Sequence, residues 1–262
     1  MPDNRLIKSF AEFLSQKGFE IVNRDDISQQ PPSEYKYAKQ IFTNKVVLLP
    51  FLLKAALTIK DTDSSFTFCP GRPEDYGKLQ TFLDSLKDGG YILDWTRNAD
   101  GHEVRLSQDA GKAKFFRSEW AEMCFRYIIM KVVQQFCQEM SPALSCKVFQ
   151  NVKIRKVSGG NELFTELDIV VQVENRFYIF EIKSGPWIRI MQWAKREEAF
   201  VDKQGCARQI VCTVHDNIPA NIFEPQILMT IGGIENRLLK LLRNDFAQPP
   251  PQPPQPPHHL TT

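Results

Sequence analysis

Apolar positions in the first part of the chain recur with a helical period. Leu6, Phe10, Phe13 and Leu14 predict an amphipathic helix over residues 4–17, which ends at Gly18. A second helix is predicted over residues 46–57, and a third stripe of apolar residues begins at Tyr76 and ends before the glycine pair at positions 89–90.

Two short strands are predicted after the third helix, over residues 91–95 and 103–106. The sequence NADG at residues 98–101 is a turn signal between them. Helices followed by a two-stranded wing resemble a winged-helix module. Such modules contact DNA in some proteins and serve packing or dimerisation in others, and the sequence leaves both roles open.

From Lys114 onward, helical and strand-like segments alternate, which is typical of an α/β domain. The segments are a helix over 119–138 capped by Ser118, strands over 147–156 and 166–183, a helix over 187–203, strands over 208–214 and 226–231, and a helix over 234–244. The chain then ends in QPPPQPPQPPHHLTT, a polyproline II sequence that we interpret as a spacer. Three regions follow: an N-terminal module over 1–110, an α/β domain over 111–246 and a proline-rich tail over 247–262.

The stretch TELDIVVQVENRFYIFEIKSG, residues 165–185, reads as a β-hairpin. A two-residue loop at Glu174-Asn175 suits a tight turn, because Asn tolerates a positive φ. With this loop, Asp168 lies opposite Glu181. Alternate side chains of a strand share a face, so Lys183 lies on the same face as Glu181. The residues on the other face are all apolar and are predicted to be core: Leu167, Ile169, Val171, Val173, Tyr178, Phe180 and Ile182.

Two opposed carboxylates in a half-buried sheet are destabilising unless something offsets them. A shared proton, the Lys183 ammonium or a divalent cation would each do so, and hard carboxylate oxygens suit Mg²⁺ or Mn²⁺. The structural alternative is a cluster of ion pairs, in which Glu166 and Lys183 form an ordinary cross-strand bridge.

The composition is that of an ordinary globular protein, with 42% apolar and 24% charged residues. No apolar run reaches the roughly 20 residues of a membrane span, and no signal peptide is recognisable, so a cytoplasmic protein without a membrane partner is expected. The 6 cysteines form no CxxC pair, which favours reduced thiols over a zinc site. Net charge is +2, but residues 101–160 hold ten Lys/Arg against five Asp/Glu, which is compatible with a polyanionic partner.

Asp168 followed by Glu181-Ile182-Lys183 resembles the D-x(12)-E-x-K form of the PD-(D/E)xK nuclease motif. The wider string N-E-L…E-L-D-I-V-V…N-R-F-Y-I-F-E-I-K-S-G is similar to the nuclease domain of CRISPR-associated effectors activated by cyclic oligoadenylate. In those proteins a winged-helix-like segment precedes the nuclease, and a W-x-E helix opens it; here this would be Trp120-Ala121-Glu122. The resemblance covers about residues 75–215.

The resemblance implies a restriction-endonuclease-like mixed sheet flanked by helices, preceded by a small winged-helix-like α+β module. Two departures limit it. The residues LFTE, 163–166, separate Asn161-Glu162 from Leu167-Asp168, so the N-E-L-D signature is interrupted. The N-terminal cyclic-nucleotide-sensing domain of those effectors also has no room in the first hundred or so residues, so regulation by such a ligand is not expected to carry over.

The resemblance implies a metal-dependent nuclease site and a role of the protein in antiviral defence. Asp168 and Glu181 would hold Mg²⁺ or Mn²⁺, helped by the backbone carbonyl of Ile182 and by Glu122, and the metal would activate a water. Lys183 would orient that water or stabilise negative charge in the transition state. Glu122 is in line with the inward-facing residues of its helix; the alternative is a first-turn acid that interacts only with the helix dipole.

Lys195 and Arg196 are candidate ligands for substrate phosphates, with solvated surface charges as the alternative, and Gln192 is a candidate for orienting water. The expected function is therefore a metal-dependent endonuclease acting on nucleic acid, with DNA favoured over RNA as the substrate and a homodimer among the expected assemblies. Two alternatives remain: a non-catalytic nucleic-acid-binding protein on a nuclease-like fold, and an assembly protein that uses the proline tail.

Overall fold

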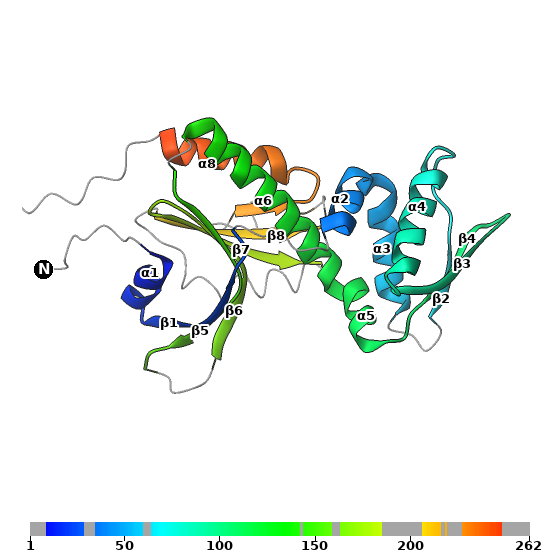
Figure 1. Ribbon diagram of the computed structural model, residues 1–262, viewed down its shortest axis with the longest axis horizontal. Coiled ribbons are helices and arrows are strands. Elements are labelled where there is room, and N and C mark those ends of the chain that lie inside the picture. The colour runs from blue at the N-terminus through cyan, green and yellow to red at the C-terminus, as the bar shows by residue number, and fades with distance from the viewer. Residues whose placement is uncertain are drawn as a thin grey trace, which may run out of the picture.

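Two β-sheets lie at opposite ends of the molecule, joined by one long helix (Figure 1). The computed structural model describes residues 9–28, 35–59, 64–141, 144–158, 163–184, 206–215, 218 and 227–247. The predicted helix over 187–203, and with it Gln192, Lys195 and Arg196, lies outside the described residues, as does the proline-rich tail.

The larger sheet has six strands in the order β1-β5-β6-β7-β8-β9. The strands are β1 (Phe19–Asp26), β5 (Cys146–Lys156), β6 (Leu163–Val173), β7 (Arg176–Lys183), β8 (Ala207–Thr213) and β9 (Ile227–Thr230). Strands β1, β5, β6 and β7 pair antiparallel, whereas β7, β8 and β9 pair parallel. The predicted fold class, α/β with a mixed sheet flanked by helices, is confirmed.

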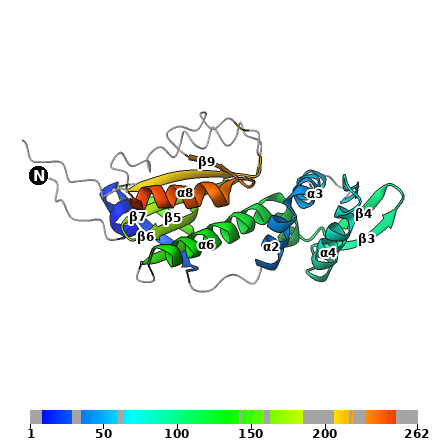
Figure 2. The same ribbon diagram turned by 90° about the horizontal axis from the view of Figure 1, so that it is seen from above.

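Both faces of this sheet are buried. One face packs against α6 (Trp120–Met140) and α8 (Ile234–Ala247), as Figure 2 shows. The other face packs against the short helix α1 (Phe10–Gln16), whose Phe10 and Phe13 rings lie 5.6 and 5.3 Å from the ring of Phe177. Val170 and Ile179, which share the face of Glu181, are therefore as deeply buried as the residues of the opposite face.

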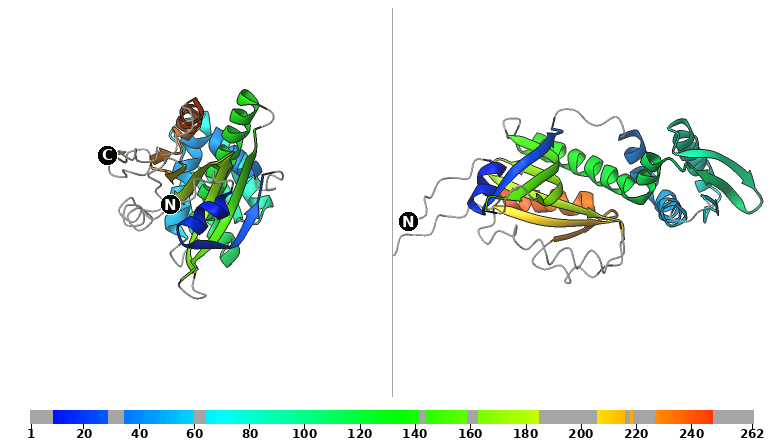
Figure 3. Two further views of the ribbon diagram at one scale, coloured as in Figure 1. Left: turned by 90° about the vertical axis from the view of Figure 1, so that its left-hand side faces the viewer. Right: turned by 90° about the horizontal axis from the view of Figure 1, so that it is seen from below.

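The edge strand β1 comes from the segment that the sequence analysis placed in the N-terminal module. It pairs with β5 and lies with α1 at the same end of the molecule (Figure 3). Residues 1–110 thus contribute to both sheets. The pairing with β1 satisfies backbone hydrogen-bonding groups on the outer edge of β5. The apolar side chains of α1 are buried against the sheet next to it.

The β6–β7 hairpin has the predicted register. Val173 pairs with Arg176, and the ladder continues to Ile169 and Phe180. The positive φ of 51° falls at Glu174, the first of the two loop residues. Leu167 departs from the prediction, because it packs in the cluster with α1 and not with Ile169. Side-chain alternation changes near Asp168, opposite Asn151, a residue of β5 that also has a φ of 51°.

The helix that leads into α6 begins earlier than predicted. Asp109 is the N-cap residue: its side chain accepts a hydrogen bond from the N–H of Lys112 at 3.0 Å. The chain then runs through α5 (Ala110–Lys114) and a π-helical turn, η1 (Phe115–Glu119), directly into α6. Ser118 is therefore not the cap. Phe115 and Phe116, which begin η1, are both buried. Their burial favours a continuous helical segment over a helix that starts after them.

The smaller sheet belongs to a winged-helix-like module with the sheet order β2-β4-β3. Its elements are α2 (Tyr35–Thr43), α3 (Lys45–Thr58), β2 (Ser65–Phe68), α4 (Asp75–Asp88), β3 (Ile92–Asn98) and β4 (Gly101–Leu106). Asn98 pairs with Gly101 across the predicted turn. Gly101 has a φ of 132°, and a Cβ there would lie 2.7 Å from the carbonyl oxygen of Phe68, so this position requires glycine.

Within the described ranges, no single helix is long and apolar enough to cross a membrane. Helices α2 and α3 satisfy the length and composition criteria only as a pair, and they are bent by 116° relative to each other.

Candidate functional site

Strands β6 and β7 separate at Asp168. Their paired register ends at Ile169 and Phe180. Beyond this pair, Oδ2 of Asp168 accepts a hydrogen bond from the backbone N–H of Ile182 at 2.7 Å. A side-chain carboxylate therefore stands where the next backbone pairing would be, and the two strands form a fork with Asp168 in it.

Glu181 and Lys183 lie on β7 beside this fork. Glu181 is only 3% exposed, which is rare for an acidic residue without a counter-charge. The ammonium of Lys183 provides that charge by pairing with Oε1 of Glu181. Since the two residues are two positions apart on one strand, they share a face, as predicted.

The carboxyl group of Asp168 also interacts with the ammonium of Lys183 through its charge. Burial raises the pKa of Asp168 to about 6, against the opposing effects of the Lys183 charge and the Ile182 hydrogen bond. Burial also works against the charged form of Lys183, but the negative charges of Glu181 and Asp168 outweigh it, so the pKa of Lys183 is raised. Both carboxylates thus act on one lysine.

Glu122, in the first turn of α6, lies close enough to influence this group. Its charge contributes to raising the pKa of both Asp168 and Lys183. The hydroxyl of Ser184, just after β7, donates to the carbonyl oxygen of Arg117 at 3.4 Å, which ties the end of β7 to η1. π-Helical turns often occur at functional sites, and this one brings the start of α6 to the fork.

The oxygen atoms at the fork suit an ion such as Mg²⁺ that takes few ligands from the protein. Across the described ranges, no three His, Cys, Asp or Glu side chains are grouped so as to hold a metal. Mg²⁺, however, typically keeps several waters and binds through one or two carboxylates together with substrate phosphates. Asp168 and Glu181 supply two such oxygen donors, and the Ile182 carbonyl is adjacent in sequence, so these residues fit that mode of binding.

Glu166 does not serve as expected in the ion-pair alternative. Its carboxylate lies 3.7 Å from the ammonium of Lys153 on β5, and both side chains are substantially exposed. The ion pair seen for Lys183 runs along its own strand to Glu181. Sequence reasoning also missed Gln209, a buried residue on β8; its only signal was an amide within the apolar run ARQIVCT.

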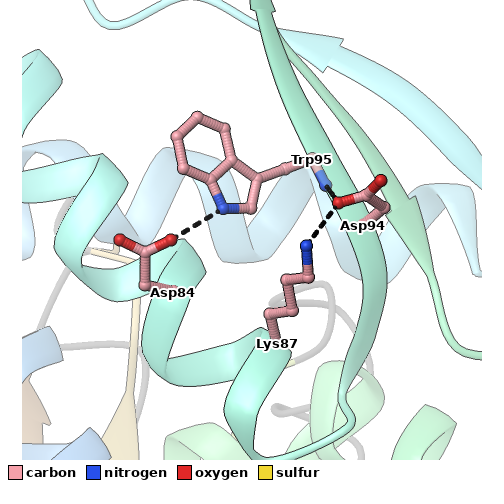
Figure 4. Close-up of polar contacts among 4 residues, drawn as sticks. All are labelled: Asp84, Lys87, Asp94 and Trp95. Carbon is pink, nitrogen blue, oxygen red and sulfur yellow. Dashed lines mark hydrogen bonds and ion pairs between the residues drawn. The ribbon is translucent and has the colours of Figure 1, made fainter.

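Two polar side chains of the wing strand β3, Asp94 and Trp95, are paired with helix α4 of the same module. The indole N–H of Trp95 donates to Asp84 at 3.0 Å, and Asp94 accepts both from the Lys87 ammonium at 2.7 Å and from the backbone N–H of Trp95 at 2.9 Å (Figure 4). Over the whole module, residues 35–106, ten Lys/Arg stand against nine Asp/Glu. This near-neutral balance leaves both roles of the winged module, packing and contact with DNA phosphates, as predictions.

No protein-family model matches the chain. Two solved structures share its fold. Protein VC1899 from Vibrio cholerae superimposes with a TM-score of 0.54 at 16% identity, over 90% of this chain and 61% of that one. Can2 from Sulfobacillus thermosulfidooxidans, in complex with cyclic tetra-adenylate, also gives a TM-score of 0.54, at 13% identity over 88% of this chain and 60% of that one.

Among curated proteins, the Fem-3 mRNA-binding factor 2 of Caenorhabditis elegans is 22% identical over 216 residues, which is 74% of this chain and 32% of the relative. The chain thus spans about three fifths of the two structural neighbours and about a third of this relative. The mixed six-stranded sheet flanked by helices is the feature that the structural neighbours support.

Proposed function

We propose that the protein is a metal-dependent nuclease that hydrolyses phosphodiester bonds in nucleic acid. The observation that carries the proposal is the fork at the end of β7, where the carboxylates of Asp168 and Glu181 both act on the ammonium of Lys183. The resemblance to the PD-(D/E)xK motif agrees with this arrangement, since D-x(12)-E-x-K supplies the same three side chains.

Each residue of the fork has a separate task in this proposal. Asp168 and Glu181 hold Mg²⁺ or Mn²⁺ with the carbonyl of Ile182, and Glu122 adds negative charge from α6. The bound metal supplies Lewis-acid polarisation of the phosphate and a more acidic water. Lys183 stabilises the negative charge that develops on the phosphoryl oxygens. Because the pKa of Asp168 is raised to about 6, its proton must leave before it can hold a cation.

The biological setting is proposed from similarity to other proteins. The hairpin resembles that of CRISPR-associated effectors, and Can2, whose structure is in complex with cyclic tetra-adenylate, has the same fold. These similarities support a role in antiviral defence, with DNA as the substrate. The name of the curated relative refers to mRNA binding, so RNA belongs in the same test. Lys195, Arg196 and Gln192 remain predicted substrate contacts, and a cytoplasmic location remains a prediction.

A cleavage assay tests the proposal. Plasmid DNA, single-stranded DNA and RNA are incubated with the protein in EDTA, Mg²⁺ or Mn²⁺. We expect cleavage only with metal, and a loss of at least about 100-fold in Asp168→Asn and Lys183→Met. The first variant weakens the metal site, and the second removes the positive charge that stabilises the phosphoryl oxygens. Glu166→Gln is the matched control: it removes a carboxylate from the same strand, yet this carboxylate pairs outward with Lys153. Cleavage by Asp168→Asn at the wild-type rate would contradict the proposed site.

A non-catalytic nucleic-acid-binding protein is the second candidate. It is favoured by the finding that no three metal-ligating side chains are grouped within the described ranges. Binding of nucleic acid in a mobility-shift assay, with intact substrate under every metal, would support this second function. If the protein neither binds nor cleaves nucleic acid, the remaining candidate is an assembly protein that uses the proline tail.

A further inference from the structure

Gln209 is a deeply buried amide in the middle of β8. Its side chain is 3% exposed, and among the residues that the structure describes neither its amide nitrogen nor its amide oxygen has a hydrogen-bond partner. A glutamine amide can donate two hydrogen bonds and accept two. Leaving such a group buried and unpaired is destabilising, so buried unpaired amides in native proteins call for a specific explanation, such as a bound water or ion.

The register of the sheet puts Gln209 on the face of the fork. Strands β7 and β8 run parallel, with Ile179 opposite Gln209 and Glu181 opposite Val211. The residues that alternate with them, Ile210 and Cys212, pack in the cluster on the opposite face. Gln209 therefore points to the side on which Glu181 and Lys183 lie.

Gln209 is also near enough to Glu181 to share a ligand. It is one strand away and two residues back, which corresponds to about 6.6 Å along the strand and about 4.8 Å across it. The two Cβ atoms are thus about 8 Å apart, and one water molecule between the ends of the two side chains fits this separation. Polarity on this face continues at Thr213, which is fully buried and lies opposite Lys183. On the opposite face of the same stretch, Phe180, Ile182, Ile210 and Cys212 are all apolar.

We propose that Gln209 is a positioning residue that holds a water molecule beside Glu181 in the candidate site. Its amide oxygen accepts a hydrogen bond from this water, and its amide nitrogen donates one, so the orientation of the water is defined. This inference rests on the proposed nuclease function and deepens it, because it assigns to β8 a part of the hydration shell of the cation held by Asp168 and Glu181.

The test compares Gln209→Met with Gln150→Met. Methionine keeps the length of glutamine but removes its hydrogen-bonding groups. Gln150 is a matched control because it lies on β5 of the same sheet, its amide oxygen is likewise buried and unpaired, and it pairs with Ile169, a residue of the opposite face. Two quantities are measured for each variant: the rise in melting temperature caused by Mn²⁺ alone, and kcat and KM for the cleaved substrate.

We expect Gln209→Met to have at least the wild-type melting temperature in EDTA, because an unpaired amide has been replaced by an apolar group. We also expect the Mn²⁺-induced rise to fall to less than about half, and kcat to fall by about tenfold with KM nearly unchanged, because only the water is misplaced. Gln150→Met should leave the Mn²⁺ response and kcat unchanged.

An unchanged Mn²⁺ response in Gln209→Met would overturn the inference, as would a lower melting temperature of this variant in EDTA. The second result would show that the amide stabilises the metal-free fold. If the wild-type protein cleaves nothing, but Mn²⁺ stabilises it and stabilises Gln209→Met less, the nuclease function fails while the role of Gln209 stands.

Discussion

At the scale of single residues, the fork balances burial against charge. Asp168 is kept from ionising easily by its surroundings, even though Lys183 and the N–H of Ile182 favour its charged form. Glu181, which is more buried, has the Lys183 ammonium as its direct partner. A buried ion pair is costly to form because both charges lose their hydration, and removing one partner costs more because the other charge stays buried and unpaired. Such a pair is therefore better evidence for a functional site than for a source of stability.

The raised pKa of Asp168 predicts how stability varies with pH in EDTA. The folded protein holds this proton up to about pH 6, whereas the unfolded chain releases it near the usual value of 3.8. Between these values the folded state binds more protons, so stability falls as the pH rises through this window. Asp168→Asn carries no charge and avoids the loss. At pH 7.5 it should be more stable than the wild type by about 2–3 kcal/mol, and the difference should vanish near pH 4.

Urea unfolding at several pH values measures this difference. Glu166→Gln serves again as control: its carboxylate is exposed, and its charge is the smallest of the causes that raise the pKa of Asp168, so its removal should change the pH profile by no more than about 0.5 kcal/mol. Equal stability of Asp168→Asn and wild type at pH 7.5 would contradict the prediction, because it would show that ionisation of Asp168 does not destabilise the folded protein.

At the scale of elements, the site depends on how the long helix starts. Helix α6 does not begin at a cap next to the fork; it continues from α5 through the π-helical turn η1. The turn carries Arg117, whose carbonyl accepts from Ser184 after β7, so helix and strand are tied together at the point where Glu122 enters. A separate helix starting at Ser118 would have presented its unpaired N–H groups to this region instead.

Two alanine variants distinguish these alternatives for the helix start. Asp109→Ala removes the side chain that caps the N–H of Lys112, so it should cost about 1 kcal/mol of unfolding free energy. Ser118→Ala should stay within about 0.5 kcal/mol, because Ser118 lies inside a continuous helical segment. Denaturant titration of both variants gives the comparison, and a larger loss in Ser118→Ala would restore the predicted cap.

At the scale of the whole molecule, the first segment of the chain completes the sheet that carries the fork. Strand β1 closes the edge of β5, and α1 covers Phe149, Phe177 and Ile179 on the face of Glu181. The winged module lies at the N-terminal end of α6, where α5 and η1 lead into that helix (Figure 1). The mixed sheet is thus assembled from two parts of the sequence that are separated by that module.

Removing residues 1–28 should therefore destroy the larger sheet and leave the winged module as the remaining folded part. The truncated protein would expose the aromatic cluster around Phe177 and lose its cooperative unfolding transition, or become insoluble. Removing residues 248–262 is the control, and we expect it to leave the melting temperature unchanged. Circular dichroism during heating measures both. A wild-type melting temperature without residues 1–28 would mean that β1 and α1 are dispensable.

The sequence by itself determined the features that depend on near neighbours. The hairpin register follows from a short loop between two alternating runs, and the common face of Glu181 and Lys183 follows from the two-residue period of a strand. The wing follows from the NADG turn. These features need only local sterics and the separation of apolar from polar positions.

Tertiary structure alone decided the features that join distant segments. Residues 19–26 pair with β5, and the side-chain alternation of β6 changes between Leu167 and Ile169. The paired register of β6 and β7 stops at Ile169, and Asp168 accepts a hydrogen bond from the N–H of Ile182. A strand's sequence shows that it has an edge and a face but not which other segment meets them, because many partners satisfy the same pattern. The burial of Gln209 is of this kind, since it depends on everything packed around β8.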